Sequence, residues 1–322
     1  MNGINTEYFL AIVEEGTLTR AALRLYVSQS SLSQYLKRLE RSLGVELFDH
    51  NVSPLRLTYA GQRFYEHVKQ QTKMEENLRR EFQDMQNEIS GRLRLGIPAW
   101  RGACLLPEVY PQMHKKYPGI RLELVECSSQ KMEQVLMNDQ IDLAVMNLPH
   151  SLDYSRFSSA PIYEERILVC MPQDDERVQA VLKNCRYSRG YPVVPFSLLA
   201  EMPLLITRPG MNLTVEVNHL LGKNRVEPKV LLETSNLTTA INLAAQGMGY
   251  AFVPEGGAKV CMRPGKVVYF AVDAPGHAWT LAAVYRKDVY LSRLARIFID
   301  EMYEAFKGMR ELSEEAERES LK

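Results

Sequence analysis

The sequence predicts a multidomain α+β protein: a helical N-terminal segment with two short strands, a long single helix, and two α/β lobes. Three observations carry this prediction. Apolar residues recur at helical spacing over residues 4 to 43, a second helical pattern runs from 59 to 89, and apolar strands alternate with helices from residue 92 onward. A chain of 322 residues that is 46% apolar and 24% charged suits two or three such domains.

Three short helices are predicted before residue 44. Gly16 ends the first helix, Thr17 caps the second, and the third begins near Ser28 and stops at Gly44. The side chains expected to face a common core are Ile4, Tyr8, Phe9, Ile12 and Val13; Leu18, Ala21, Ala22 and Leu25; and Leu32, Tyr35, Leu36, Leu39 and Leu43.

The third helix is polar on the side away from its leucines. Winding residues 28 to 43 at about 100° per residue gathers hydroxyls, an amide and cations there. These residues are Ser30, Ser33, Gln34, Lys37, Arg38 and Arg41. Hydroxyls and amides reach base edges, and cations neutralise phosphates. A solvated surface is the simpler explanation for an isolated helix, but the short connection from Leu25 to Ser28 predicts a helix-turn-helix that reads DNA.

A wing and a long helix follow. Residues 46–48 and 55–58 read as two strands joined by a polar turn that contains Pro54. The helix over 59–89 then carries an apolar seam interrupted by Gln71 and Glu75. The seam residues are Phe64, Val68, Leu78, Phe82, Met85 and Ile89. Such a seam favours a coiled-coil partner helix, and hence a dimer; packing against the chain's own C-terminal domain is the alternative.

The domain boundaries follow from these patterns. The predicted parts are a winged helix-turn-helix at 1–58, a linker helix at 59–89, a hinge at 90–91, two α/β lobes at 92–306 and a charged tail at 307–322 that we expect to fray. The near-continuous apolar strands predict mostly parallel sheets covered on both faces. Residues 172–201 are less regular and read as a helix plus a long connection.

Composition and motifs restrict the function. No stretch is long and apolar enough to span a bilayer, and the first residues have no signal-peptide pattern, so we expect a cytoplasmic protein. Enzyme motifs such as GxSxG, the P-loop and HExxH are missing and the six histidines are dispersed, so we expect no enzyme, no cofactor and no metal site. The thiols of Cys104, Cys127, Cys170, Cys185 and Cys261 have no CxxC spacing. Inert thiols are the simpler interpretation, and a redox sensor that uses Cys170 or Cys185 is the alternative.

The sequence resembles those of the LysR-type transcriptional regulators. The resemblance rests on EEGTLTRAA, VSQSSLS, RLE, LGVELF and RLTYAG in the first 61 residues, and more loosely on LRLGIPAW, IDLAVM and AINLAAQGMGYAFVPE. It implies a winged helix-turn-helix, a linker-helix dimer and a two-lobed effector domain like a periplasmic binding protein. It further implies a homotetramer in which a small metabolite resets DNA bending and contact with RNA polymerase.

The resemblance also assigns DNA contacts. Those it implies are Gln29, Ser30, Ser33, Gln34, Lys37 and Arg38, with Arg56 as the main cation of the wing. Two departures matter, because Ser30 stands where proline is usual and Asp49, His50 and Asn51 stand where the wing normally carries a basic pair. The first 58 residues hold six cations and six anions, so we expect affinity to come from placement and from several modules acting together.

Effector-binding residues are expected between the lobes, at strand ends. The candidates are Pro98, Ala99, Trp100 and Arg101 after the first strand, Ser128 and Ser129 after the second, Asn147 after the third, Thr207 and Arg208 in the second lobe, and Thr234, Ser235 and Asn236 before a later helix.

Chemistry suggests roles for some of these candidates. The two arginines could clamp a carboxylate, and Trp100 could cover an apolar ring. Each has an ordinary alternative: helix caps for Ser128, Thr234 and Ser235, packing for Trp100, and solvation or salt bridges for the arginines. A regulator triggered by thiol oxidation instead of a metabolite stays open.

Overall fold

The computed structural model describes residues 6–50, 52, 54–85, 89–260, 265–272, 279–309 and 311. The chain divides into two compact units, Met1–Gln83 and Asp84–Lys322. The predictions made for Ile4, Asn51 and Cys261, and for most of the tail, lie outside the described residues.

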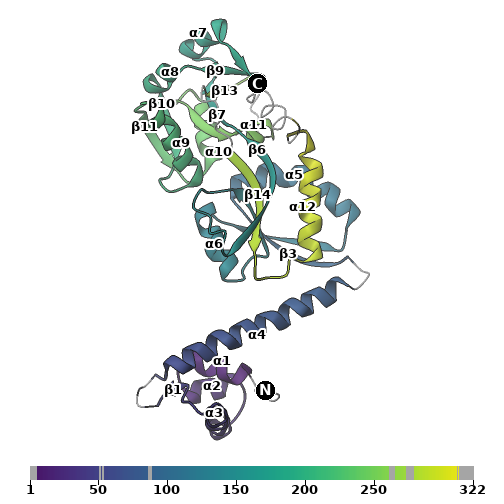
Figure 1. Cartoon of the computed structure of the whole chain (residues 1–322). Helices are drawn as coiled ribbons and strands as arrows, with labels where there is room; N and C mark the ends of the chain where they lie inside the picture. Colours follow the sequence, from purple (N-terminus) through teal and green to yellow (C-terminus); the bar gives the residue numbers. More distant parts are fainter. Residues whose placement is uncertain are drawn as a thin grey trace. The chain divides into compact units, whose positions relative to one another are not determined.

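The first unit is a winged helix-turn-helix followed by a long helix, as the sequence predicts (Figure 1). Its elements are α1 (Thr6–Glu15), α2 (Leu18–Arg24), α3 (Gln29–Leu43), β1 (Phe48–Asp49), β2 (Arg56–Leu57) and α4 (Tyr59–Asp84). β1 and β2 pair antiparallel, which forms the predicted wing from shorter strands than expected.

The predicted helix ends are confirmed by their hydrogen bonds. Gly16 and Gly44 adopt left-handed backbone angles, with φ of +67° and +73°. The Thr17 hydroxyl accepts from the amide of Arg20 at 3.3 Å, and the Ser28 hydroxyl accepts from the amide of Ser31 at 3.1 Å. These bonds satisfy amides that a helix start leaves without partners.

The predicted stripes form the core of this unit. The fully buried members are Phe9, Ile12, Ala21, Ala22, Leu32, Leu36 and Leu39, joined by Leu47 and Phe48 from the wing. Gly61 lets the start of α4 lie against the wing, because a Cβ there would come within 1.9 Å of the Leu47 carbonyl oxygen. Thr58 fixes the same junction by donating to the Glu46 carbonyl and accepting from the Gly61 amide.

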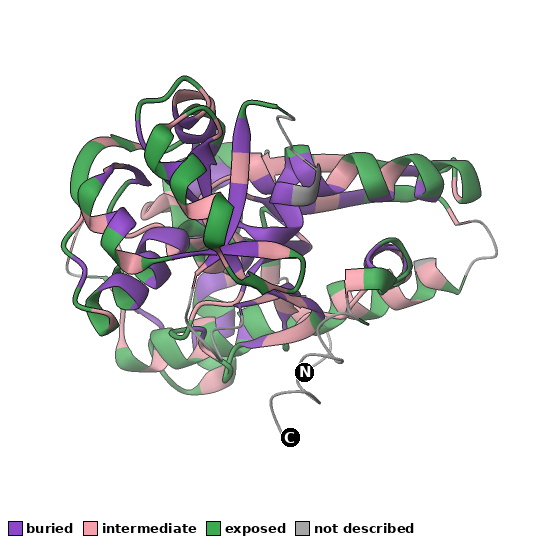
Figure 2. Cartoon of the chain, turned by 90° about the horizontal axis from the view of Figure 1, so that it is seen from above, coloured by how far each residue is buried: buried purple, intermediate pink, exposed green. Residues whose placement is uncertain are grey.

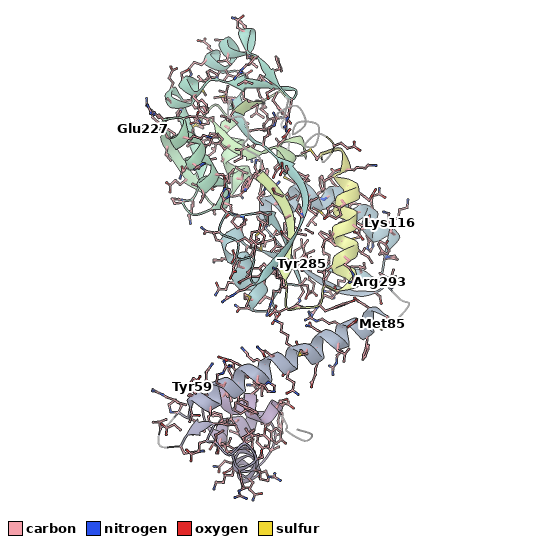
Figure 3. All side chains as sticks on the ribbon, in the orientation of Figure 1. Tyr59, Met85, Lys116, Glu227, Tyr285 and Arg293 are labelled. Atoms are coloured by element: carbon pink, nitrogen blue, oxygen red, sulfur yellow. The ribbon has the colours of Figure 1, made fainter. Side chains whose placement is uncertain are left out.

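The single seam predicted over residues 59–89 is wrong in its first half and at its end. α4 ends at Asp84, and Ile89 packs against a core of the second unit. Val68 is buried and Phe64 partly buried in the helix-turn-helix core, so these two residues are already covered within the unit. Leu78, Phe82 and Met85 are 48%, 56% and 67% exposed, and Met74 joins them. Figure 3 labels Tyr59 and Met85, which mark the start of α4 and the residue just after its end. The exposed apolar stripe therefore belongs to the second half of the helix.

The first lobe of the second unit is a five-stranded sheet in the order β4-β3-β5-β14-β6. Its strands are β3 (Gly91–Ile97), β4 (Ile120–Glu126), β5 (Leu143–Asn147), β6 (Phe157–Glu165) and β14 (Trp279–Arg286). Its helices are α5 (Ala99–Lys116), α6 (Ser129–Met137) and α12 (Arg293–Ala305). Helices α5 and α12 cover one face and α6 the other (Figure 1), which forms two apolar clusters. Lys116, labelled in Figure 3, donates to Glu301 and joins α5 to α12.

The second lobe holds the remaining elements around one large core. Its strands are β7 (Ile167–Pro172), β8 (Tyr187–Ser188), β9 (Tyr191–Val194), β10 (Pro203–Thr207), β11 (Lys229–Thr234), β12 (Ala251–Pro254) and β13 (Val267–Val272). Its helices are α7 (Glu176–Asn184), α8 (Phe196–Glu201), α9 (Asn212–Lys223), α10 (Leu237–Ala244) and α11 (Glu255–Val260). The order β12-β7-β13-β9-β8 is extended toward β10 and β11 by a bridge between Leu204 and Tyr250.

The expectation of mostly parallel sheets is correct only in part. β3 pairs in parallel with β4 and β5, β10 with β11, and β9 with β13. By contrast, β14 pairs antiparallel with β5 and β6, and β7 pairs antiparallel with β12 and β13. The reason is that the chain changes lobe twice, leaving the first lobe at Arg166 and returning between Val272 and Trp279. Strand β6 was not predicted, and residues 172–201 contain α7, β8, β9 and α8 where a helix and a long connection were expected.

Burial follows this architecture. Figure 2 shows buried residues concentrated in the strands and exposed residues along outer helix faces. In the described part of the chain, none of the helices has the length and apolar character needed to cross a membrane.

Candidate nucleic-acid interface and effector-binding strand ends

Helix α3 presents one polar face. Its leucines Leu32, Leu36 and Leu39 are buried, and the opposite side is open to solvent. The exposed members of the predicted set are Gln29, Ser30, Gln34, Lys37 and Arg38, together with Arg41 on the same helix and Arg56 on β2, while Ser33 is half-buried. The structure thus brings the α3 candidates together on one face, with hydroxyls and amides near the start of the helix and cations toward its end.

The serines at the start of α3 also serve the helix itself. The Ser28 hydroxyl lies 3.0 Å from that of Ser30 and 2.7 Å from that of Ser31. Part of the serine richness of this stretch is therefore local capping, which a count of hydroxyls does not reveal.

Ion pairs explain how a module of zero formal charge can have a positive face. Arg24 pairs with Glu14 at 2.5 Å and Arg20 pairs with Glu15 at 3.0 Å, so these α2 cations are balanced by α1. Glu40 is buried and accepts hydrogen bonds from the amides of Leu47 and Phe48. These three anions are thus paired or turned inward, whereas the cations of α3 reach solvent.

The effector candidates lie at paired strand ends. In the first lobe, Ile97 at the end of β3 is in register with Glu126 at the end of β4, so Pro98 and Ser128 follow at one edge. In the second lobe, Thr207 is in register with Thr234, so Arg208 and Ser235 follow at one edge. Pro98 and Ser128 precede α5 and α6, whose first residues are Ala99 and Ser129.

Arg101 is occupied by a buried partner. Its guanidinium lies 2.6 Å from a carboxylate oxygen of Glu165 and also donates to the side-chain oxygen of Asn147. The Asn147 amide donates to Glu165, and the Gly256 amide donates to the same carboxylate at 2.8 Å. Burial alone would lower the pKa of Arg101. The groups around it, Glu165 foremost, together raise it by a larger amount, so the pKa of Arg101 lies above its ordinary value. This geometry favours the salt-bridge alternative for Arg101.

Several other candidates serve the fold. The Thr207 hydroxyl bonds to buried Thr214, the Thr234 hydroxyl accepts from the Asn236 amide, and the Asn236 side chain caps α10 by accepting from the amide of Thr238. Trp100 packs over Gly257, where a Cβ would clash with its ring.

Four polar candidates, Ser128, Ser129, Arg208 and Ser235, are not committed to such roles. Ser128 stands at the cap position of α6 but its side chain makes no capping hydrogen bond, and Arg208 is exposed.

Apart from Asn147, contacts between the lobes involve residues that were not among the predicted site residues. The Asn212 side chain at the start of α9 donates to the Asn147 carbonyl at 3.3 Å, and His150 lies 3.2 Å from Glu216. Gly210 has a φ of +86°, and a Cβ there would lie 2.8 Å from the amide nitrogen of Gln130. The partners of these contacts are far apart in sequence, and no motif marks them.

The described cysteines do not resemble activated thiols. Burial raises the pKa of Cys170 to about 12, although the neighbouring Tyr269 lowers it in part, and burial also raises the pKa of Cys127. Cys104 is buried and Cys185 is partly buried. Among the described residues, no group of His, Cys, Asp and Glu has the arrangement of a metal site.

Two protein-family models match the chain. Residues 5–62 match the bacterial regulatory helix-turn-helix protein, lysR family, and residues 86–307 match the LysR substrate binding domain. The two matches correspond to the helix-turn-helix with the start of α4 and to the two lobes.

Relatives extend the similarity to nearly the whole chain. The uncharacterized HTH-type transcriptional regulator YcgK of Bacillus subtilis (strain 168) is 30% identical over 309 residues, covering 94% of each chain. The HTH-type transcriptional regulator BsdA of the same strain is 28% identical, covering 91% of this chain and 97% of that protein. An H2O2-bound cysteine-to-serine mutant of Corynebacterium glutamicum OxyR superimposes with a TM-score of 0.59 at 23% identity, covering 96% of this chain and 94% of that one. At that identity the likeness shows the fold alone.

Proposed function

Because the chain belongs to the LysR family of bacterial transcriptional regulators, we propose that a small molecule bound between its two lobes resets how its helix-turn-helix contacts DNA. The chain is a LysR-type DNA-binding regulator with an effector-binding domain, and the family consists of regulators rather than enzymes. A regulator of this type acts where chromosomal DNA lies, so a cytoplasmic location is part of the proposal.

One observation carries the DNA-binding part of the proposal. The leucines of α3 are buried while Gln29, Gln34 and Lys37 are exposed on the opposite face. In a helix-turn-helix the second helix enters the major groove with such a face. We assign base contacts to Gln29, Ser30, Ser33 and Gln34, and phosphate contacts to Lys37, Arg38 and Arg56, because amides and hydroxyls read bases and cations neutralise phosphates.

The DNA contacts are tested by the pattern of lost affinity. The duplex is the region upstream of the chain's own gene, and binding is measured by fluorescence anisotropy at several salt concentrations. Lys37→Ala should reduce the slope of log affinity against log salt by about 0.9, the value for one lost phosphate contact. Gln34→Ala should weaken binding roughly tenfold with the slope unchanged.

Lys115→Ala is the matched control, because Lys115 is an exposed cation on α5 in the other unit. Equal binding by all three variants and the parent chain would overturn the assignment of α3 as the DNA-reading helix.

We further propose that two copies of the chain pair through the second half of α4. Its exposed Leu78, Phe82 and Met85 support this, because an apolar stripe on a long helix is stable only when a partner covers it. Dimerisation also lets two helix-turn-helix modules of zero formal charge bind the same DNA, so that their affinities combine. A homotetramer and contact with RNA polymerase are the further assembly that we propose.

The proposed effector site rests on two polar side chains at the strand ends that have no role in the fold. Ser128 lies at the N-terminus of α6 without a capping bond, and Arg208 is an exposed cation next to Thr207. A hydroxyl with helix amides behind it and a guanidinium both favour an anion, so we propose a small carboxylate as the effector. Asn147, Asn212 and Gln130 would frame the same region, because they take part in close approaches between the lobes.

The effector site is tested by separating ligand response from DNA binding. Aromatic and short aliphatic carboxylates are titrated into the protein bound to the upstream duplex, and the footprint is read with and without each acid. Ser128→Ala and Arg208→Gln should abolish the change in footprint and leave DNA affinity in its absence unchanged.

Lys229→Gln, an exposed cation at the other end of β11, should respond like the parent chain. Loss of DNA binding without ligand in the Ser128 or Arg208 variant would contradict an effector role for that residue.

A further inference from the structure

Tyr26 is an aromatic residue for which the fold gives no packing reason. It lies between α2 and α3 and is 97% exposed, the largest exposed fraction of the described large apolar side chains. Its backbone is in the left-handed region with φ of +53°, a conformation that side chains with a Cβ disfavour.

The local hydrogen bonds show that glycine would suit this position better. The Val27 amide donates to the Ala22 carbonyl at 3.0 Å, and the Tyr26 amide donates to the Leu23 carbonyl at 3.3 Å. These two bonds make the Schellman motif, whose left-handed residue is usually glycine. Tyrosine therefore costs stability here and, being exposed, offsets none of that cost by burial.

The same motif recurs elsewhere in the chain. Its left-handed position is taken by Gly247 after α10, as expected for this motif. After α6 the same position is taken by Asp139, whose carboxylate pairs with Arg286 at 2.8 Å. Arg225 occupies it after α9 and is exposed. Strain alone thus does not distinguish Tyr26, but strain, full exposure and a place beside the DNA-reading helix occur together only there among the described residues.

We propose that Tyr26 is a DNA-contacting residue whose phenol hydroxyl donates a hydrogen bond to a backbone phosphate. The proposal rests on the proposed function of α3 and names a contact outside the helix. In a helix-turn-helix the first helix crosses the DNA backbone and the second enters the groove, so the turn between them lies near phosphates. Tyr26 lies in that turn, two residues before the Ser28 cap of α3.

The contact is uncharged, and this gives it a distinct signature. Tyrosine hydroxyls are among the groups that bind phosphate oxygens without reading sequence. Losing the hydroxyl releases no counterion, so affinity falls while its dependence on salt stays the same. Losing a lysine contact, by contrast, lowers both the affinity for DNA and the dependence of that affinity on salt.

Two variants of the full-length chain test the proposal on the upstream duplex. Tyr26→Phe removes only the hydroxyl and should weaken binding roughly fivefold, the effect of one ordinary hydrogen bond, with an unchanged salt slope. Tyr26→Gly should weaken binding at least tenfold while its thermal midpoint stays the same or rises, because glycine relieves the strained backbone. Loss of affinity without loss of stability is the expected outcome.

Arg225→Gly is the matched control, because it relieves the same motif in the other unit. It should leave DNA affinity unchanged. Lys37→Ala in the same assay separates the two proposals. If Lys37→Ala weakens binding and neither Tyr26 variant does, the Tyr26 contact is overturned and the role of α3 stands; if none of them has an effect, both fail.

A second copy of the chain is the competing partner for an exposed tyrosine. Analytical ultracentrifugation of Tyr26→Gly without DNA should give the same oligomeric state as the parent chain. A shift toward smaller species would overturn the DNA contact in favour of self-association.

Discussion

Glu40 connects the DNA-reading helix to the wing through backbone amides. Its carboxylate accepts from the amides of Leu47 and Phe48 at 2.8 and 3.3 Å and lies 3.3 Å from His50. The wing strands are two residues each and offer few hydrogen bonds of their own. A single buried side chain on α3 therefore sets where β1 begins.

Removing this carboxylate should loosen the wing. Glu40→Ala leaves two buried amides without an acceptor, which costs about 2 kcal/mol or more. Native-state hydrogen exchange should then be at least tenfold faster at Leu47 and Phe48. Glu40→Gln keeps one acceptor oxygen and should show a smaller effect, whereas equal protection in both variants and the parent chain would contradict this role.

The thiol of Cys170 should be inert. Burial raises its pKa to about 12, so almost no thiolate exists at pH 8, and the thiolate is the reactive form. Because the folded state favours the neutral thiol, this group's contribution to stability is complete below the ordinary thiol pKa. It is lost as the pH rises from there toward 12.

We expect maleimide at pH 8 to label Cys170 only after urea unfolding, with peptide mass spectrometry as the readout. Rapid labelling of the folded protein at Cys170 would revive the redox alternative.

Arg101 shows where residue-level reasoning from sequence stops. Its place just after the first strand was predicted, but its partner Glu165 is 64 residues away in a strand that was not predicted. Capping residues behave differently, because Thr17, Ser28 and Asn236 bond to amides two or three residues away. Local partners are visible in a sequence, whereas distant ones are not.

Elements were predictable where one face is apolar and capping residues are in place. Helices α1 to α3 lie where they were predicted, although α2 ends at Arg24, two residues before the end of the predicted segment. The described residues of their predicted apolar faces pack in one core. Strand β6 satisfies neither, because its sequence FSSAPIYEE contains Pro161 and little apolar alternation. The tertiary pairing of β6 with β14 overrides that weak local preference.

The division of α4 into a covered half and an exposed half leads to a prediction about assembly. Leu78→Ala with Phe82→Ala removes apolar area from the exposed stripe and should shift the chain toward smaller oligomers in sedimentation velocity. Glu76→Ala with Arg80→Ala alters the opposite side of the same turns and should leave the oligomer unchanged. If both pairs behave like the parent chain, α4 is not the interface.

A buried ion pair of the first lobe lies where the chain crosses into the second lobe. Arg101 of α5 and Glu165 of β6 have side chains 4% and 0% exposed, and the Gly256 amide of α11 in the second lobe bonds to the same carboxylate. Arg166 next to it pairs with Glu255 of α11 at 3.1 Å. The consecutive residues Glu165 and Arg166 thus both bind the first residues of α11.

Breaking this pair should destabilise the whole second unit. Arg101→Met leaves a buried carboxylate uncompensated, which costs about 3–5 kcal/mol. The double variant Arg101→Met with Glu165→Met removes both charges and should recover much of that loss. Chemical denaturation followed by the near-UV signal of the two tryptophans, Trp100 and Trp279, measures both. A single variant as stable as the parent chain would mean that the pair contributes nothing.

The position of β14 has a consequence for synthesis of the protein. This strand lies between β5 and β6, yet it begins only at Trp279, after the entire second lobe. The ribosome therefore synthesises the helix-turn-helix complete and early, while the first lobe lacks β14, the strand that joins β6 to the rest of its sheet, until the end of synthesis. A stop codon just before residue 279 would release a chain that keeps α3 but leaves the facing edges of β5 and β6 unpaired, a substrate for proteases and aggregation.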